Sequence, residues 1–128
     1  MMKFIPGEQG FTLIELIAVL VILSVLAAIA IPRYLSLDES ARQKAIDAGI
    51  AELNGRETLT WSNMKITSTG YVDDITLFSE LSTTLGHDYN WQGGAPSRSG
   101  GTLKFKDSTL IPLTRTGSTR SKPGYWSR

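Results

Sequence analysis

The stretch FTLIELIAVLVILSVLAAIAIP, residues 11–32, decides the fold of this chain of 128 residues. From Phe11 to Ile31 it offers 21 residues suited to hydrocarbon, except for Glu15 near the start. A helix needs about 20 such residues to cross a hydrocarbon core of about 30 Å, so the stretch predicts a membrane-spanning helix. A carboxylate at the bilayer centre costs at least about 2.5 to 3.5 kcal/mol, and less near an end. Glu15 therefore needs a compensating partner.

The composition of the rest of the chain limits what it can do. About 97 residues lie beyond the apolar segment, which is one small domain. The net charge of +1 gives no overall attraction to nucleic acid. The chain has no cysteine, so it has neither a disulfide framework nor a thiolate metal site. The stability of a small domain must then come from packing against something else.

The apolar segment has a rival interpretation as a secretory signal. Lys3 supplies a thin positive region, and residues 28–30, Ala-Ile-Ala, match a cleavage site before Ile31. Against this interpretation, the apolar stretch is longer than the apolar region of a signal peptide, which usually has about 7 to 15 residues, and a helical pattern continues beyond it. Positive charge does not set the orientation, because Lys3 on one side is matched by Arg33 and Arg42 on the other.

The hexapeptide GFTLIE, Gly10 to Glu15, resembles the processing motif of type IV prepilins and type II secretion pseudopilins. With the apolar helix, Pro32 and the amphipathic stretch beyond, the resemblance covers roughly the first half of the chain. It implies a leader of residues 1–10 that a membrane peptidase removes after Gly10, and N-methylation of Phe11. Such leaders are often rich in Lys and Arg beside the cut, whereas residues 8–9 here are Glu-Gln.

The resemblance also implies a structural function and a set of partners. The expected protein is a pilus subunit, with a secretion pseudopilin as the alternative, and it is not an enzyme and holds no cofactor. It would be a single-pass protein of the bacterial inner membrane before assembly. It would then join a helical filament with copies of itself and other pilins, as an extracellular pilus or a periplasmic pseudopilus. An assembly platform with a separate ATPase would drive this step, since the sequence has no nucleotide-binding motif.

Cleavage after Gly10 would create an amine on Phe11, about one helical turn from Glu15. The amine of an adjacent subunit would then neutralise this carboxylate in hydrocarbon. The alternative is that Glu15 reaches the membrane surface from a lone helix. A glycine beside the cut also suits a peptidase that must approach the backbone closely.

A second helical segment follows the membrane span. Pro32 removes a backbone hydrogen bond, so we expect a kink or a short melted stretch there. Good helix formers then continue over residues 32–61. Its apolar residues follow two faces rather than one stripe. The face with small residues suits contact with other subunits and the branched face suits the chain's own domain: the first comprises Tyr34, Leu37, Ala41, Ala45 and Ala48, the second Ile46, Ile50 and Leu53.

Residues 62–128 predict a small α+β head, in which the long helix packs on a small antiparallel sheet as in pilins. Asp73 and Asp74 precede a short helix from Ile75 to Leu85, stopped by Gly86. Alternating residues at 102–106 and 109–115 predict a hairpin, with Pro112 suggesting an edge strand. Residues 89–92 are a candidate third strand.

The head offers little catalytic chemistry. His87 is the only histidine and has no nucleophile to pair with. The scattered aspartates are better explained as caps and turns than as a calcium site, so no metal is expected. Basic residues mixed with aromatics are typical of single-stranded nucleic-acid grooves. The alternative of a DNA-binding minor pilin rests on such a tail, although nucleic acid is the less favoured partner; its candidate contacts are Arg120, Lys122, Tyr125 and Trp126.

Overall fold

The structure, a computed structural model, describes residues 10–128. The chain order is α1 (Leu13–Ile66), α2 (Asp74–Glu80), β1 (Tyr89–Trp91), β2 (Gly100–Phe105), β3 (Ile111–Thr116) and β4 (Tyr125–Ser127). The chain forms two compact units, which divide within α1 between Asp38 and Glu39. The expected leader lies outside the described residues, except for Gly10.

The N-terminal part of α1 is apolar, and its side chains are exposed among residues 10–128. Its most apolar window of 18 residues has a mean hydropathy of 3.0, and none of that window is buried. By length and composition this helix can cross a membrane. It continues through Pro32 without interruption, so the melted stretch considered above is not observed. A kink at Pro32 stays a prediction.

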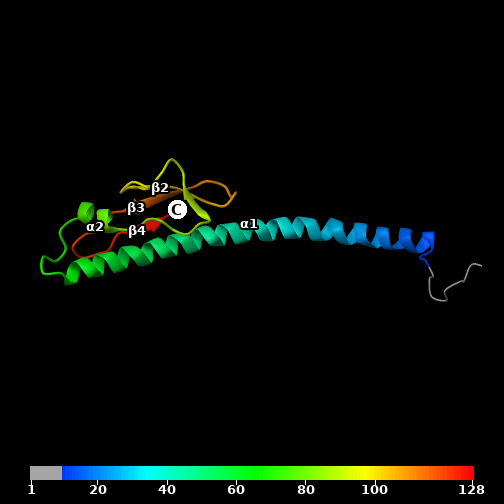
Figure 1. Ribbon diagram of the computed structural model, residues 1–128, viewed down its shortest axis with the longest axis horizontal. Helices are drawn as coiled ribbons and strands as arrows, with labels where there is room; N and C mark the ends of the chain where they lie inside the picture. Colours follow the sequence, from blue (N-terminus) through cyan, green and yellow to red (C-terminus); the bar gives the residue numbers. More distant parts are fainter. Residues whose placement is uncertain (1–9) are drawn as a thin grey trace, which may run out of the picture. The chain divides into compact units, whose positions relative to one another are not determined.

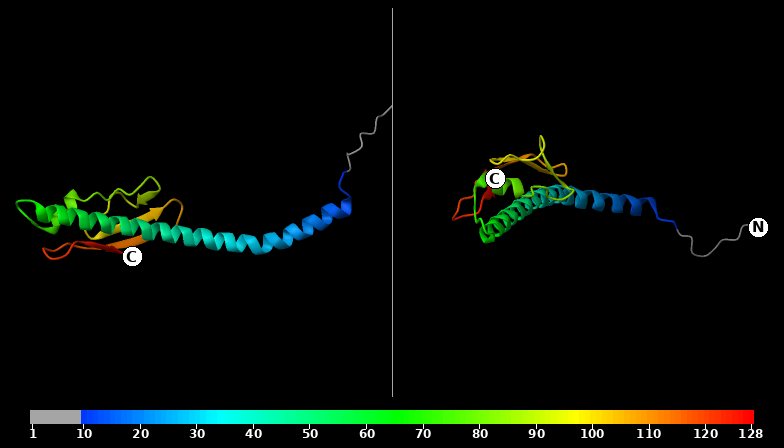
Figure 2. Two further views of the ribbon diagram at one scale, coloured as in Figure 1. Left: turned by 90° about the horizontal axis from the view of Figure 1, so that it is seen from below. Right: turned by 60° about the vertical axis from the view of Figure 1, so that its left-hand side comes forward.

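The second unit contains the C-terminal part of α1 and a four-stranded antiparallel sheet in the order β1-β2-β3-β4. Figure 1 shows the sheet lying along this green part of α1, and the right-hand view in Figure 2 shows the sheet on one side of it. The α+β arrangement of a long N-terminal helix and a small antiparallel sheet is confirmed. Neighbouring strands pair through Trp91 and Leu103, Leu103 and Ile111, and Arg115 and Trp126.

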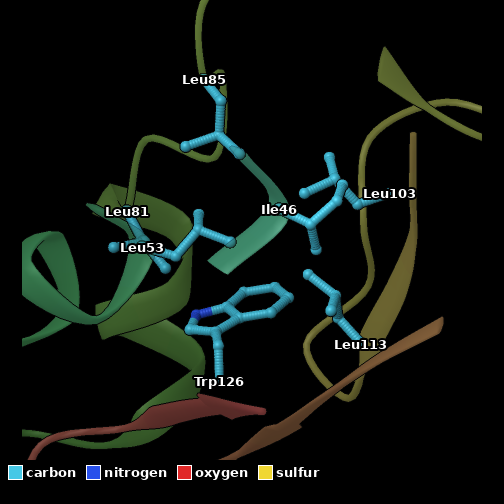
Figure 3. Close-up of a cluster of buried hydrophobic side chains, with 7 residues drawn as sticks. All are labelled: Ile46, Leu53, Leu81, Leu85, Leu103, Leu113 and Trp126. Carbon is cyan, nitrogen blue, oxygen red and sulfur yellow. The ribbon is translucent and has the colours of Figure 1, made fainter. Parts of the chain in front are cut away.

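The core lies between α1 and the sheet (Figure 3). Ile46 and Leu53 of α1 are buried at 1% and 0% exposure, and Ile50 packs against the same cluster. The branched face of the helix therefore packs on the chain's own domain, as predicted. The other core residues come from the α2 region and the sheet: Leu81, Leu85, Leu103, Leu113 and Trp126.

Two helix ends differ from the sequence prediction. The long helix ends at Ile66 rather than near Trp61. The helix α2 begins as predicted, with the Asp73 side chain accepting a hydrogen bond from the Thr76 backbone at 2.7 Å, but it ends at Glu80.

The early end of α2 has a physical cause. Side chains elsewhere bind the backbone carbonyls that follow it: Arg56 donates to the oxygens of Ser82 and Thr84, and Trp91 donates to that of Thr83. These carbonyls are satisfied without helical hydrogen bonds. An extended chain thus follows α2 and still carries Leu85 to the core.

The sheet contains one strand more than predicted, which corrects the position of Pro112. The strand β3 that holds it lies between β2 and β4, so it is not an edge strand. Pairing with β4 covers only Thr114 to Thr116. The backbone N–H of Arg115 bonds toward the β2 side, so alternation turns the Pro112 nitrogen toward the β4 side, beyond the paired residues. A missing donor is tolerated there.

Candidate processing and assembly site and a buried ion-pair network

The start of α1 is a reciprocal capping box. The backbone N–H of Thr12 donates to Oε2 of Glu15 at 3.3 Å, and the backbone N–H of Glu15 donates to the Thr12 hydroxyl at 3.3 Å. The first N–H groups of a helix have no intrahelical partner, so the two side chains satisfy donors that would otherwise be unpaired. Glu15 therefore has a partner within its own chain.

The residues around the expected cut are accessible. Phe11 is 81% exposed, and a Cβ added to Gly10 would have no atom within 4 Å. A peptidase can approach an exposed junction that lies before the start of a helix. Sequence reasoning identified Gly10, Phe11 and Glu15 but missed the capping box, although the spacing Thr-x-x-Glu at residues 12–15 is its standard signal.

A second polar site lies buried in the head, and sequence reasoning missed it. Glu57 and Arg115 are fully buried and paired: Nε of Arg115 donates to Oε1 of Glu57, and Nη2 donates to Oε2 at 3.2 Å. The same guanidinium binds Asp74, with Nη1 3.0 Å from Oδ2 and Nη2 2.8 Å from Oδ1. One arginine of β3 therefore joins a carboxylate of α1 to a carboxylate of α2.

All polar atoms of this network are satisfied. The remaining N–H of Arg115 donates to the Arg98 carbonyl at 3.1 Å, which uses all five guanidinium donors. Trp126 donates from Nε1 to Glu57 at 2.9 Å, while the backbone and hydroxyl of Ser118 donate to Asp74 at 2.6 and 2.7 Å. Full satisfaction is what makes a buried charge tolerable.

The network shifts two pKa values in opposite directions. Burial acts to raise the pKa of Asp74, but hydrogen bonds from Arg115 and Ser118 outweigh burial and lower it to about 2. Burial likewise acts to lower the pKa of Arg115, but the bonds to Asp74 and Glu57 raise it above its ordinary value. The guanidinium and the Asp74 carboxylate are thus both charged over the physiological range.

The sequence held a signal for this network. Glu57 follows Leu53 by four residues and Ile50 by seven, so it continues the buried face of α1. Arg115 lies two residues after Leu113 in the strand, so both side chains point to the same side of the sheet. Two opposite charges at core positions of two elements predict a buried ion pair.

The candidate nucleic-acid contacts of the tail differ in their exposure to solvent. Arg120, Lys122 and Tyr125 are exposed, whereas Trp126 is completely buried in the core. Trp126 therefore has no free face on which a base could stack, and its inclusion in a nucleic-acid site was wrong. Within residues 10–128, no group of three or more histidine, cysteine or acidic side chains is arranged to hold a metal ion.

The N-terminal segment has recognisable relatives. Residues 5–31 match the family described as Prokaryotic N-terminal methylation motif. The chain is 51% identical over 43 residues to the type IV narrow pilus major component PilA5 of Thermus thermophilus, a match that covers 34% of this chain and 37% of that protein. It is 39% identical over 51 residues to the type IV major pilin protein PilA of Myxococcus xanthus, covering 40% of this chain and 23% of that protein. No solved structure matches the chain.

These matches show that the N-terminal segment is similar to that of type IV pilins, as the motif around Gly10 predicted. Both alignments span well under half the length of the relatives they match. The likeness and the apolar helix support a pilin-type structural subunit with a membrane-anchoring segment.

Proposed function

We propose that this chain is the structural subunit of a type IV pilus. It is inserted in the inner membrane through residues 11–31, cleaved after Gly10 and N-methylated at Phe11. It then polymerises through its N-terminal helix, with copies of itself and with other pilins. The observation that carries this proposal is the match to the methylation motif over residues 5–31, together with an apolar helix whose most apolar window is not buried among residues 10–128. The names of both relatives favour a pilus over a secretion pseudopilus.

The proposal requires partners for processing and for assembly. A prepilin peptidase and methylase would act at the exposed junction of Gly10 and Phe11. An inner-membrane platform with its own ATPase would extract the subunit, because moving an apolar helix out of a bilayer opposes the hydrophobic effect. The subunit itself has a structural role and is not an enzyme.

Glu15 has two roles in this proposal. Its Oε2 caps the helix within its own chain. A carboxylate has about four acceptor positions, so it can also bind the Phe11 amine of an adjoining subunit. Pairing both charges is necessary because removing one partner of a buried pair typically costs about 3 to 5 kcal/mol.

Substitutions at residues 12 and 15 test these roles separately. Glu15→Leu should insert and be cleaved, because the helix becomes more apolar and Gly10 is unchanged. It should not form filaments. Thr12→Val removes only the hydroxyl of the capping box, so it should weaken the helix start by about 0.5 to 2 kcal/mol but still assemble. Intact mass reports cleavage, and electron microscopy of sheared cells reports filaments.

Glu15→Gln is the matched control, since it keeps the size and hydrogen bonding of the side chain but loses the charge. If Gln assembles and Leu does not, a hydrogen bond suffices and charge neutralisation is wrong. Filaments from both variants would remove the role of Glu15 in assembly. Substituting Gly10 with Ile should leave uncleaved precursor in the membrane. If the mass of the mature protein instead corresponds to a chain that begins at Ile31, the protein is a secreted domain and the whole proposal is wrong.

A further inference from the structure

A polar pocket lies at the C-terminal end of α1, far along the chain from the processing motif. It has a volume of about 230 Å³ and is lined by Lys65, Thr69, Gly70, Tyr71 and Arg120. All five residues belong to the compact unit that begins at Glu39.

Hydrogen bonds from two side chains of α1 and from one side chain of the segment after it hold the loop that carries Arg120. Trp61 donates from Nε1 to the Thr119 carbonyl at 2.8 Å, and Lys65 donates from Nζ to the Arg120 carbonyl at 2.9 Å. The Tyr71 hydroxyl donates to the Ser118 carbonyl at 2.9 Å. The backbone of this loop is therefore held in place before any ligand arrives, which lowers the entropy cost of binding.

The charged side chains that line the pocket, Lys65 and Arg120, are both positive. Residues 58–72 and 108–128 contain no aspartate or glutamate. The nearest acidic residues in sequence do not line the pocket: Asp73 caps α2, and Asp74 accepts hydrogen bonds from Arg115 and Ser118. Lys65 complements the C-terminal end of α1, which accounts for one cation. Arg120 and Lys122 are exposed, and within residues 10–128 neither side chain donates a hydrogen bond or forms an ion pair.

We propose that this pocket binds a phosphate group of a phosphodiester polymer. The guanidinium of Arg120 offers paired donors that match two phosphate oxygens, while Lys65 and the Thr69 hydroxyl complete a set of donors around a tetrahedral anion. Lys122, two residues along the loop, contacts the next charged unit of the polymer. Since Trp126 is buried, the polymer is recognised by its charge and not by base stacking. This binding does not depend on whether the chain forms filaments.

Fluorescence anisotropy of the full-length subunit in non-ionic detergent tests the proposal. The probes are an abasic oligodeoxynucleotide and a thymidine oligonucleotide of equal length, each titrated at several salt concentrations. We expect similar affinities for both probes. Arg120→Gln should bind about tenfold more weakly, and each lost phosphate contact should reduce the salt slope by about 0.7. Arg120→Lys should recover part of the affinity through its charge.

The matched control is Lys44→Gln, which removes one positive charge from an exposed position of α1 outside the pocket. Its affinity should be unchanged. If Lys44→Gln loses as much affinity as Arg120→Gln, the binding depends on overall charge and the proposed site is wrong. If the thymidine probe binds and the abasic probe does not, the polymer is recognised by its bases and not by its charge. Competition by inorganic phosphate at the concentration of the oligomer would overturn the polymer as the ligand.

Discussion

At the scale of the residue, Arg115 shows how one buried charge connects distant parts of the head. Its guanidinium is fully buried and binds Glu57 and Asp74 on two different helices. Gly124 makes room for this pair, because a Cβ added there would lie 2.5 Å from Oε2 of Glu57. A larger residue would displace the carboxylate from the arginine.

Removing this arginine should destabilise the head strongly. Arg115→Met would leave Glu57 buried without a counter-charge, so the free energy of unfolding should fall by about 3 to 5 kcal/mol. Arg128→Met is the matched control, because Arg128 pairs with Asp47 at 3.1 Å where both side chains are about 40% exposed. Exposed pairs contribute less than about 1 kcal/mol. Urea denaturation of a fragment that begins at Tyr34 compares the two, and equal losses would contradict a dominant buried network.

The same network predicts an acid dependence. The pKa of Asp74 in the folded chain is about 2, below the ordinary value of 3.8, so the folded state holds the ionised form more strongly than the unfolded state does. This contribution is complete above about pH 4 and is lost as the pH falls through 2. Asp74→Asn should remove this part of the pH dependence of the melting temperature, whereas Asp107→Asn in an exposed turn should keep it. Unchanged acid dependence in Asp74→Asn would show that another group is responsible.

At the scale of the element, the two parts of α1 differ in what surrounds their side chains. Its first part exposes apolar side chains, and its last part buries one face against the sheet. Asn54 adds a specific link: its amide donates to the Trp126 carbonyl at 3.0 Å and accepts from the Trp126 N–H at 2.7 Å. This side chain satisfies the outer edge of β4, where an unpaired strand would otherwise invite another chain.

A charge on the buried face of α1 should therefore unfold the head. Leu53→Asp places a carboxylate at a fully buried position and removes a core side chain, so it should cost at least about 3 kcal/mol. Leu59→Asp makes the same change at a position of the same helix that is 62% exposed, and it should be nearly neutral. Thermal unfolding of the fragment that begins at Tyr34 gives both values. Similar melting temperatures for the two variants would mean that the buried face has been assigned wrongly.

The sequence predicted these elements where a local pattern determines them. The spacing of Ile46, Ile50 and Leu53 identified the packing face, and Asp73 marked the start of α2. The end of α2 was not predictable in the same way, because it depends on Arg56, which is distant in sequence. The role of Trp126 depends likewise on Asn54 and Glu57, which meet it only after the chain has folded. Tertiary contacts determined what local propensity could not.

At the scale of the whole molecule, the sheet depends on α1 for more than apolar contact. The helix supplies Ile46 and Leu53 to the core, the acceptor for Trp126 Nε1, and one of the two carboxylates that neutralise Arg115. Without α1, a sheet of short strands would expose its apolar face, and Arg115 would lose both of its hydrogen bonds to Glu57. Small domains without disulfides rarely tolerate such a loss.

We therefore expect the boundary of autonomous folding to lie within α1 and not after it. A fragment of residues 39–128 contains the whole compact unit and should unfold cooperatively, with dispersed amide signals in NMR spectra. A fragment of residues 67–128 retains α2 and all four strands but should give the narrow dispersion of an unfolded chain. Adding a separate peptide of residues 39–66 should restore dispersion, because the lost contacts come from that segment alone. A folded 67–128 fragment would show that the sheet forms its own core and that α1 is an accessory to it, which would also contradict the strong effect expected for Leu53→Asp.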